Sequence, residues 1–342
     1  MPITHAADTD FSGSANWLRA AFDASFEAGQ PSRITQSACQ GITPPTAVIA
    51  LGKAAGAMAD GARAAGVTAP GILITTDENH RQIDGLECLA ASHPVPDSRG
   101  LQAAGKVAAL VERLGADDHL LLLISGGGSA LLPAPASGIS LAQKIALNDA
   151  LLTSGLDIHD MNVIRRLFST LKGGRLARLA APAKLTQFLL SDVPGDRLES
   201  IASGVAVADP VPFDYACDLV KAHRLDQLEF VAAQMAALAD NPALGPVRPG
   251  DPALDHVDGR ILASNAQCRD AATASLAGIL PAIEQLDMPE LGGEARQMAQ
   301  RLVTEICQHK ASAFAAGETG KIFGFATGGE TVVTLSGATA GL

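Results

Sequence analysis

The sequence predicts an α/β protein built on a doubly wound parallel sheet, with a second, smaller α/β domain. Two unbroken apolar runs, at residues 47–51 and 120–124, indicate strands buried on both faces, because helices cover both sides of a parallel sheet. Each run ends in a turn that contains glycine, and helical stretches alternate with strands along the chain. At 342 residues the chain exceeds the usual size of one domain.

The other elements of the first domain follow from local patterns. Residues 14–28 place apolar side chains at helical spacing and predict an amphipathic helix. An alanine-rich helix is expected after the first strand, up to about Gly66, and Asp97 is placed to cap a helix that runs to Leu114. Further strands are expected at residues 72–76, 87–91 and 184–190, and further helices at 140–153 and 161–180.

The clearest boundary lies at residues 239–258, which are rich in proline and glycine and show little periodicity. We therefore expect one domain at residues 1–245 and a second at 246–342. The second is predicted to contain a strand at 260–263, a helix from about Ala266, a helix at 295–315 and strands at 322–326 and 331–335. Because the chain stops seven residues after the last strand, we expect this domain to be incomplete.

Composition argues against several classes of partner. The net charge is −11 and aromatic residues make up 4% of the chain, which disfavours binding to nucleic acid or to an anionic membrane surface. The five cysteines are far apart and form no Cys-x-x-Cys pair, so neither a zinc site nor a disulfide framework is indicated. The first ten residues include two acids and no apolar core, so we expect a cytoplasmic protein.

The most informative segment is Ser125-Gly126-Gly127-Gly128-Ser129-Ala130, directly after the strand at 120–124. Three glycines between serines allow the backbone to turn tightly and to direct several N–H groups toward one point. Such turns hold anions at the carboxyl edge of α/β sheets. The alternative is a tight strand-to-helix turn that needs glycine for its backbone geometry alone.

Two further residues near predicted strand ends are candidates for binding or catalysis. Lys53 follows the strand at 47–51 and precedes a helix, where the helix dipole favours an anion rather than an ammonium group. An anionic ligand that bridges Lys53 and the helix would explain this position; a solvent-exposed lysine is the alternative. His93 lies in the proline-rich loop His93-Pro94-Val95-Pro96-Asp97 and could bind a carboxylate or act as a base, or be merely exposed.

Cations and carboxylates cluster after later elements. Arg165 and Lys172 lie on a predicted helical hairpin together with Asn162 and two glycines. Asp192 and Asp196 follow the strand at 184–190 and are suited to a hydrated Mg²⁺ ion. Turn and helix-cap hydrogen bonding is the alternative role for these two carboxylates.

Nine segments in series resemble the class II glycerate 2-kinase family, whose C-terminal part is called the MOFRL domain and whose members are often labelled hydroxypyruvate reductase. The resemblance extends over about residues 14–335. They are Gly52-Lys53-Ala54-Ala55, His93-Pro94-Val95-Pro96-Asp97, Ser125-Gly126-Gly127-Gly128-Ser129-Ala130-Leu131, Asn162 with Arg165 and Ser169, Lys172-Gly173-Gly174-Arg175-Leu176-Ala177, Ser191-Asp192-Val193-Pro194-Gly195-Asp196, Ile201-Ala202-Ser203-Gly204, Ser264-Asn265 and Gly328-Gly329-Glu330-Thr331.

The resemblance implies ATP-dependent phosphorylation of D-glycerate at its 2-hydroxyl group, with Mg²⁺, to give 2-phosphoglycerate. It implies a cleft between a Rossmann-like N-terminal domain and a smaller C-terminal domain, with D-glycerate and a nucleotide as partners and a homodimer as the assembly. Catalysis is expected from Lys53 and Asp192, with Asp192 and Asp196 as metal ligands. Substrate and phosphate binding is expected from Ser125, Gly126, Gly127, Gly128, Ser129, His93, Arg165, Lys172, Ser203, Gly204, Asn265 and Glu330.

The chain departs from the family pattern at two places. After Ser203-Gly204 the family continues Pro-Thr-Val, whereas this chain has Val205-Ala206-Val207. The family also follows its Gly-Gly-Glu-Thr strand with an arginine that acts with the lysine, and this arginine has no counterpart here. We therefore expect the chain to be truncated relative to the family and its turnover to be impaired.

Two other functions are weighed against a kinase. An NAD(P)-dependent hydroxypyruvate reductase would need the G-x-G-x-x-G fingerprint after a strand. The residue three positions after Gly128 is Leu131, and the segment from Gly52 to Gly56 does not fit either. The other possibility is a protein that binds the ligand of the N-terminal domain without turnover.

Overall fold

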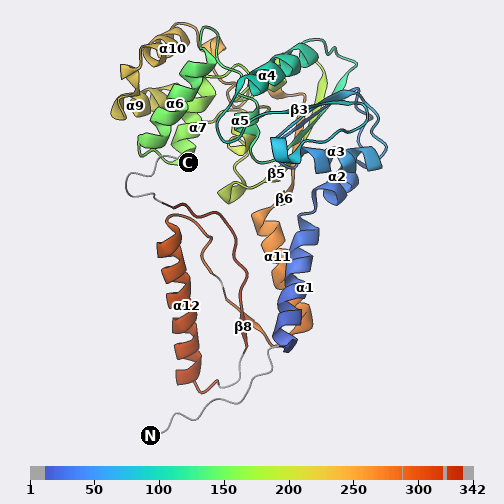
Figure 1. The fold of residues 1–342 in the computed structure, drawn as a ribbon, viewed down its shortest axis with the longest axis vertical. Coiled ribbons are helices and arrows are strands. Elements are labelled where there is room, and N and C mark those ends of the chain that lie inside the picture. The colour runs from blue at the N-terminus through green and yellow to red at the C-terminus, as the bar shows by residue number, and fades with distance from the viewer. Residues whose placement is uncertain (1–11, 287, 319–321, 334–342) are drawn as a thin grey trace. The chain divides into compact units, whose positions relative to one another are not determined.

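The computed structural model describes residues 12–286, 288–318 and 322–333, which form two compact units (Figure 1). One unit, here called the sheet unit, runs from Pro31 to Leu262. The other, here called the second unit, combines the chain up to Gln30 with the chain from Ala263 onward. No helix of the described residues is long and apolar enough to cross a membrane.

Six strands form the sheet in the order β3-β2-β1-β4-β5-β6, and the ladders that join β3, β2, β1, β4 and β5 are all parallel. This is the strand order of a Rossmann-like doubly wound sheet, so the predicted fold class is confirmed. The strands are β1 (Ala47–Leu51), β2 (Gly71–Thr75), β3 (Leu86–Ala90), β4 (His119–Ile124), β5 (Lys184–Ser191) and β6 (Val257–Ser264).

Alternate residues of each strand face opposite helix layers, as the pleat requires. Ile49, Leu122 and their neighbours pack with α4 (Ser98–Val111) and α8 (Arg175–Ala180). Val48, Leu121 and their neighbours pack with α2 (Pro31–Cys39) and α3 (Ala55–Ala64). Figure 1 shows α4 on one face of the sheet and α2 and α3 on the other, which is why the strands are apolar along their whole length.

The carboxyl ends of β1 and β4 meet at the point where the strand order reverses. The Lys53 amide donates to the Gly126 carbonyl over 2.9 Å, and the Ala54 amide donates to Ser125 Oγ over 3.0 Å. Gly52 has φ +122°, and a Cβ there would overlap Ser125, so this approach requires glycine. Ligands of doubly wound sheets bind in the crevice at such a switch point.

Four helices form a separate layer beside the sheet, packed around Phe168, Ile164 and Val231. Phe168 contacts Phe230 edge to face, with the ring centroids 6.5 Å apart. The helices are α6 (Leu141–Thr153), α7 (Ile158–Leu167), α9 (Phe213–Ala222) and α10 (Glu229–Asp240).

The single helix predicted at residues 161–180 is wrong. The chain forms α7, then a loop, then α8, because Gly173 and Gly174 have φ values of +61° and +78°. A Cβ on Gly173 would lie 2.7 Å from Pro246 Cβ, so the loop packs too closely against that segment for a helix to continue. The apolar periodicity on either side concealed this interruption.

In the second unit, α1 (Ser12–Ala28) packs along α11 (Asn265–Ile279), with Trp17 and Ala21 against Ala272 (Figure 1). The unit also contains α12 (Ala295–Ala315), β7 (Glu284–Gln285) and β8 (Phe323–Gly324). The strand expected at 322–326 is therefore shorter than predicted. A second strand is expected at 331–335. Within it the structure has an isolated bridge at Val332, and residues 334–335 lie outside the described residues.

The structure divides the chain differently from the expected boundary at residues 245 and 246. Residues 12–30 belong with the C-terminal part, because the apolar side of α1 is covered by α11. Residues 246–262 belong to the sheet unit, because β6 pairs at the edge of the large sheet.

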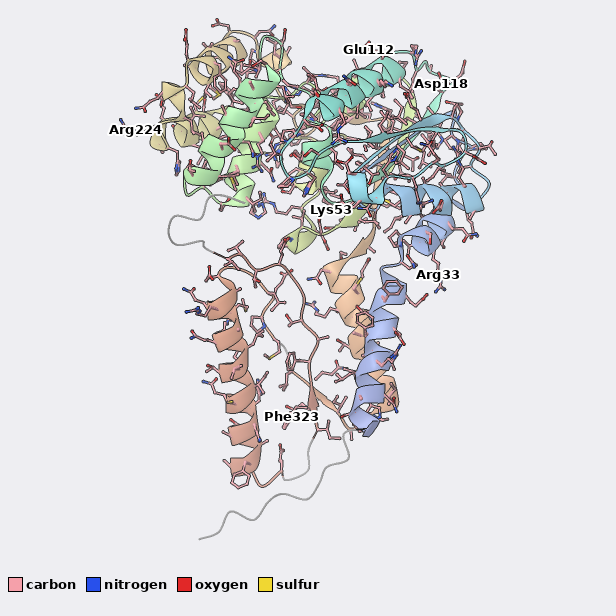
Figure 2. The ribbon with its side chains drawn as sticks, in the orientation of Figure 1. Arg33, Lys53, Glu112, Asp118, Arg224 and Phe323 are labelled. Atoms are coloured by element: carbon pink, nitrogen blue, oxygen red, sulfur yellow. The ribbon has the colours of Figure 1, made fainter. Side chains whose placement is uncertain are left out.

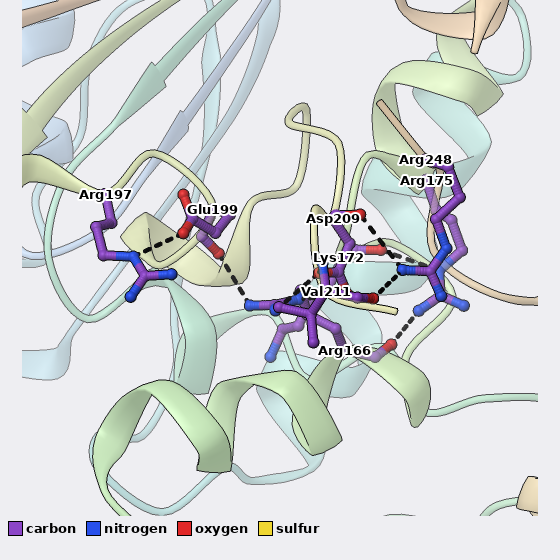
Figure 3. Close-up of polar contacts among 8 residues, drawn as sticks. All are labelled: Arg166, Lys172, Arg175, Arg197, Glu199, Asp209, Val211 and Arg248. Carbon is purple, nitrogen blue, oxygen red and sulfur yellow. Dashed lines mark hydrogen bonds and ion pairs between the residues drawn. The ribbon is translucent and has the colours of Figure 1, made fainter. Parts of the chain in front are cut away.

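A buried ion pair ties α7 to the loop that follows β5 (Figure 3). Arg166 Nε and Nη2 donate to the two carboxylate oxygens of Asp209 over 2.8 and 2.9 Å, and both side chains are 2% exposed. Arg166 Nη1 also donates to the Glu199 carbonyl over 3.3 Å. Arg175 and Arg248 donate to neighbouring backbone carbonyls. Hydrogen bonds from guanidinium groups therefore connect the segments of this interior region.

We predict that Asp209→Ala lowers the stability of the sheet unit by about 3–5 kcal/mol, because it leaves a buried guanidinium without its partner. Native-state hydrogen exchange of the β4 amides would measure the change. The control is Arg81→Ala, which breaks the exposed Arg81–Asp60 pair and should cost less than about 1 kcal/mol. Equal effects of the two variants would contradict this prediction.

Candidate active site

A cavity of about 310 Å³ opens beside the carboxyl ends of β4 and β5. It brings together seven of the residues predicted from the sequence: His93, Gly126, Gly127, Ser129, Arg165, Lys172 and Asp192. The rest of the lining includes Pro94, Pro96, Ala130, Pro133, Lys144, Leu147, Asn148, Leu152, Ile158, Asn162, Val193, Ser200, Ile201 and Ala202.

The glycine turn presents unpaired amides beside this cavity. Gly127, with φ +85°, precedes the short helix α5 (Gly128–Leu131). Within the described part of the chain, the amides of residues 126–129 donate to no carbonyl and no side chain. Successive free N–H groups of this kind suit an anion.

Lys53 and His93 lie against the same turn. A Cβ on Gly127 would lie 3.3 Å from Lys53 Cγ and 3.2 Å from His93 Cδ2. Figure 2 marks Lys53, whose side chain is exposed. Burial, followed by the charge of Lys53, lowers the pKa of His93 below its usual value, so its imidazole is neutral at pH 7.

Three cations line the cavity, and none of them pairs with a carboxylate among the described residues. Lys144 Nζ donates to the carbonyls of Phe168 over 2.7 Å and Arg165 over 3.2 Å. Arg165 donates to Asn148 Oδ1 over 2.5 Å. Lys172 Nζ donates to the Ser129 carbonyl over 2.6 Å.

Burial depresses the pKa of each of these three groups. The pKa of Lys144 falls well below its usual value, first through burial and then through the charges of Lys172, Arg175 and Arg165. Burial and Arg165 lower the pKa of Lys172 to about 7, and burial lowers the pKa of Arg165. A bound anion would relieve this cost, so the arrangement suits an anionic ligand.

Asp192 is the carboxylate of the cavity lining. It lies directly against Gly126, where a Cβ would overlap its carboxylate. Asp196 follows the left-handed Gly195 and is not among the lining residues. No group of three or more His, Cys, Asp or Glu side chains that could hold a metal forms within the described ranges.

The residues near Asp192 nevertheless fit a Mg²⁺ ion that is bound mostly by water and phosphate, because such ions need only one or two protein carboxylates. A phosphate on the amides of residues 126–129 would be repelled by the carboxylate of Asp192 at Gly126 unless a cation lay between them.

Ser203 and Gly204 lie behind the lining rather than in it. Ser203 is fully buried with φ +58°, and its Oγ lies 2.9 Å from Ser129 Oγ. The Gly204 carbonyl accepts from the Gly174 amide over 2.7 Å. Ser203 therefore contacts the lining through Ser129, and the binding roles of Ser203 and Gly204 remain predictions.

Two predicted residues, Asn265 and Glu330, belong to the second unit. Asn265 begins α11, and its Nδ2 lies 3.5 Å from Glu290 Oε1. Glu330 is exposed. Their roles in binding remain predictions.

Sequence reasoning missed Lys144. It lies in α6 in line with Leu147 and Leu151, on the buried side of the helix. The available signal was a lysine on the apolar stripe of an amphipathic helix, where a solvated lysine is not expected.

The strand order defines a doubly wound α/β protein, and the glycine turn at the switch point and the cavity lined by basic side chains form its candidate site. A family model described as "Domain of unknown function (DUF4147)" matches residues 17–237. The chain belongs to this family, and the resemblance to class II glycerate 2-kinases is confirmed.

Individual relatives carry two kinds of name. A protein of Agrobacterium vitis named a hydroxypyruvate reductase is 38% identical over 297 residues, covering 86% of this chain and 65% of that protein. A D-glycerate 2-kinase of Thermotoga maritima is 38% identical over 198 residues, covering 57% of this chain and 47% of that protein. The crystal structure of a glycerate kinase from Thermotoga maritima superposes with a TM-score of 0.77 at 30% identity, covering 96% of this chain and 77% of that one. The chain thus spans less than two thirds of the length of these two relatives.

We predict that Gly127→Val weakens the binding of inorganic phosphate at least about tenfold, or about 1.4 kcal/mol. The side chain would collide with Lys53 and His93 and close the turn. Isothermal titration would measure binding, and thermal unfolding would show that the fold persists.

The matched control is Gly138→Val. Gly138 has φ +81°, so a side chain meets the same backbone strain, but nothing lies within 4 Å of its Cβ position. Loss of binding in both variants would mean that strain alone, and not the site, is responsible.

Proposed function

We propose that this protein is a glycerate 2-kinase, which transfers the terminal phosphoryl group of ATP to the 2-hydroxyl group of D-glycerate with the aid of Mg²⁺. The observation that carries the proposal is the small cavity lined by Lys144, Arg165 and Lys172 beside the amides of the glycine turn. The names of the relatives from Thermotoga maritima support it.

The acceptor fits the cationic side of the cavity. Ligand cavities usually measure about 300–1,000 Å³, and this one lies at the small end, as a three-carbon acid requires. Arg165 is the natural partner of the carboxylate, because a guanidinium remains charged and offers paired N–H donors. Lys144 lines the same cavity.

The donor phosphates fit the glycine turn. The amides of residues 126–129 and the ammonium group of Lys53 would neutralise phosphoryl charge, which is the main requirement of this chemistry. Asp192 would hold Mg²⁺, and the ion would supply charge neutralisation for the phosphates. Asp196 would contribute less, since it does not line the cavity.

A hydroxypyruvate reductase, the name given to the Agrobacterium vitis relative, is the competing function. Its dinucleotide would need a third glycine for close helix–strand packing, and the position is taken by Leu131, which is fully buried in the core. A coupled assay for ADP release beside an assay for NADH oxidation separates the two, and titration with ATP and D-glycerate detects binding without turnover.

We predict that Lys53→Ala lowers kcat at least about 100-fold, or about 3 kcal/mol of lost charge stabilisation. The measurement is steady-state ADP release with D-glycerate. Lys106→Ala, which removes an exposed lysine paired with Glu87, is the control and should leave kcat unchanged. A loss below tenfold in Lys53→Ala would place Lys53 outside the reaction centre.

We predict that Asp192→Asn raises the Mg²⁺ concentration for half-maximal rate about tenfold, or about 1.4 kcal/mol, because it keeps size and removes charge. A Mg²⁺ titration of the rate measures this, with Asp196→Asn as the milder comparison. If the Asp192→Asn titration curve coincides with the wild-type curve, Asp192 serves the turn alone.

A further inference from the structure

The amine of Lys172 is buried and held by two contacts with Ser129. Its side chain is 2% exposed, yet it lines the cavity. Its Nζ contacts the carbonyl and the Oγ of Ser129 at 2.6 and 2.9 Å, and Ser129 Oγ lies 2.9 Å from Ser203 Oγ. Two contacts to one residue fix the direction of the amine.

The surroundings favour the neutral form of this amine. Near it are Lys144 of α6, Arg165 of α7 and the hydroxyls of Ser129 and Ser203, while Arg175 of α8 donates to the backbone carbonyl of Lys172. Asp192 and His93 line the cavity as well, but no carboxylate in the described part of the chain pairs with Lys172. Burial and Arg165 lower the pKa of Lys172 to about 7, so near neutral pH much of it carries a lone pair.

We propose that Lys172 is the catalytic base that takes the proton of the acceptor hydroxyl during phosphoryl transfer. This deepens the proposed kinase function and rests on it. The O–H bond of the acceptor breaks and an N–H bond forms on Lys172. The same oxygen bonds to the terminal phosphorus of ATP, the bond from that phosphorus to the bridging oxygen breaks, and ADP departs with the electron pair.

The contacts with Ser129 leave one tetrahedral position of the amine free. A neutral amine has two N–H bonds, which the Ser129 carbonyl and Oγ accept, and the remaining position holds the lone pair. Lys172 lines the cavity, and we infer that this position faces the bound hydroxyl group.

Lys144 is the other buried amine and does not suit this role. Its Nζ donates to two backbone carbonyls, those of Arg165 and Phe168, and so closes the end of α7. Arg165 cannot serve, because a guanidinium keeps its proton. The division of work is therefore carboxylate binding by Arg165 and proton transfer by Lys172.

Substrate binding should strengthen this base. A carboxylate bound at Arg165 offsets the positive charge that depresses the pKa of Lys172. The pKa therefore rises in the complex. Since kcat/KM reports the free enzyme and kcat the complex, the acidic limb of kcat should lie at higher pH than that of kcat/KM.

The test is the pH dependence of both constants between pH 5.5 and 9 for the wild-type chain, Lys172→Arg and Lys144→Arg. The wild type should lose kcat/KM below about pH 7, with the kcat limb displaced upward. Lys172→Arg keeps the charge but cannot accept a proton, so kcat should fall about 100-fold or more and the limb should disappear, with KM little changed. Lys144→Arg should keep the limb.

Two results overturn the role of Lys172 and leave the kinase function intact. One is an active Lys172→Arg enzyme with the wild-type pH profile. The other, which does not depend on any variant folding, is a wild-type kcat/KM with no acidic limb near pH 7. A wild-type chain that binds D-glycerate by isothermal titration but releases no ADP overturns the kinase function itself and, with it, the base.

Discussion

The pairing of Arg166 with Asp209 is the interaction on which the site depends. From Arg166 the chain runs through the end of α7 and a loop to Lys172, which lines the cavity. Ile201 and Ala202 also line it, and they lie in the segment that leads to Asp209. The ion pair therefore joins two walls of the cavity. Its neighbour Arg165 faces the cavity instead and contacts Asn148. Two successive residues of one helix thus supply a guanidinium in the buried ion pair and a guanidinium that lines the cavity.

The buried charges of the sheet unit are unbalanced. Among its described residues, Lys144, Arg166, Lys172 and Arg175 are buried, whereas Asp209 is the one buried carboxylate. The chain as a whole has a net charge of −11. An acidic surface therefore surrounds a basic interior. The charge of the whole chain and the charge of the site have opposite signs for this reason.

The sequence predicted the sheet well, because strands buried on both faces are apolar throughout and end in glycine, as at Leu51-Gly52 and Ile124-Ser125-Gly126. It also named Arg165, Lys172 and Asp192 as candidate site residues, and all three line the cavity. It failed where distant segments decide local structure. The break at Gly173 depends on Pro246, and the partner of α1 is α11, which starts 237 residues after α1 ends. Lys144 was missed because its burial depends on the packing of α6 rather than on its residue type.

The association of α1 with α11 has a consequence for synthesis of the chain. The sheet unit is an insertion within the second unit, since the chain leaves that unit at Gln30 and returns at Ala263. At about 5–20 residues per second, a ribosome needs roughly 10–50 s after α1 has emerged before α11 follows it. The sheet unit can fold during that time, whereas Trp17 and Ala21 are not yet covered by α11. Cellular chaperones would therefore meet α1 as an exposed amphipathic helix on every nascent chain.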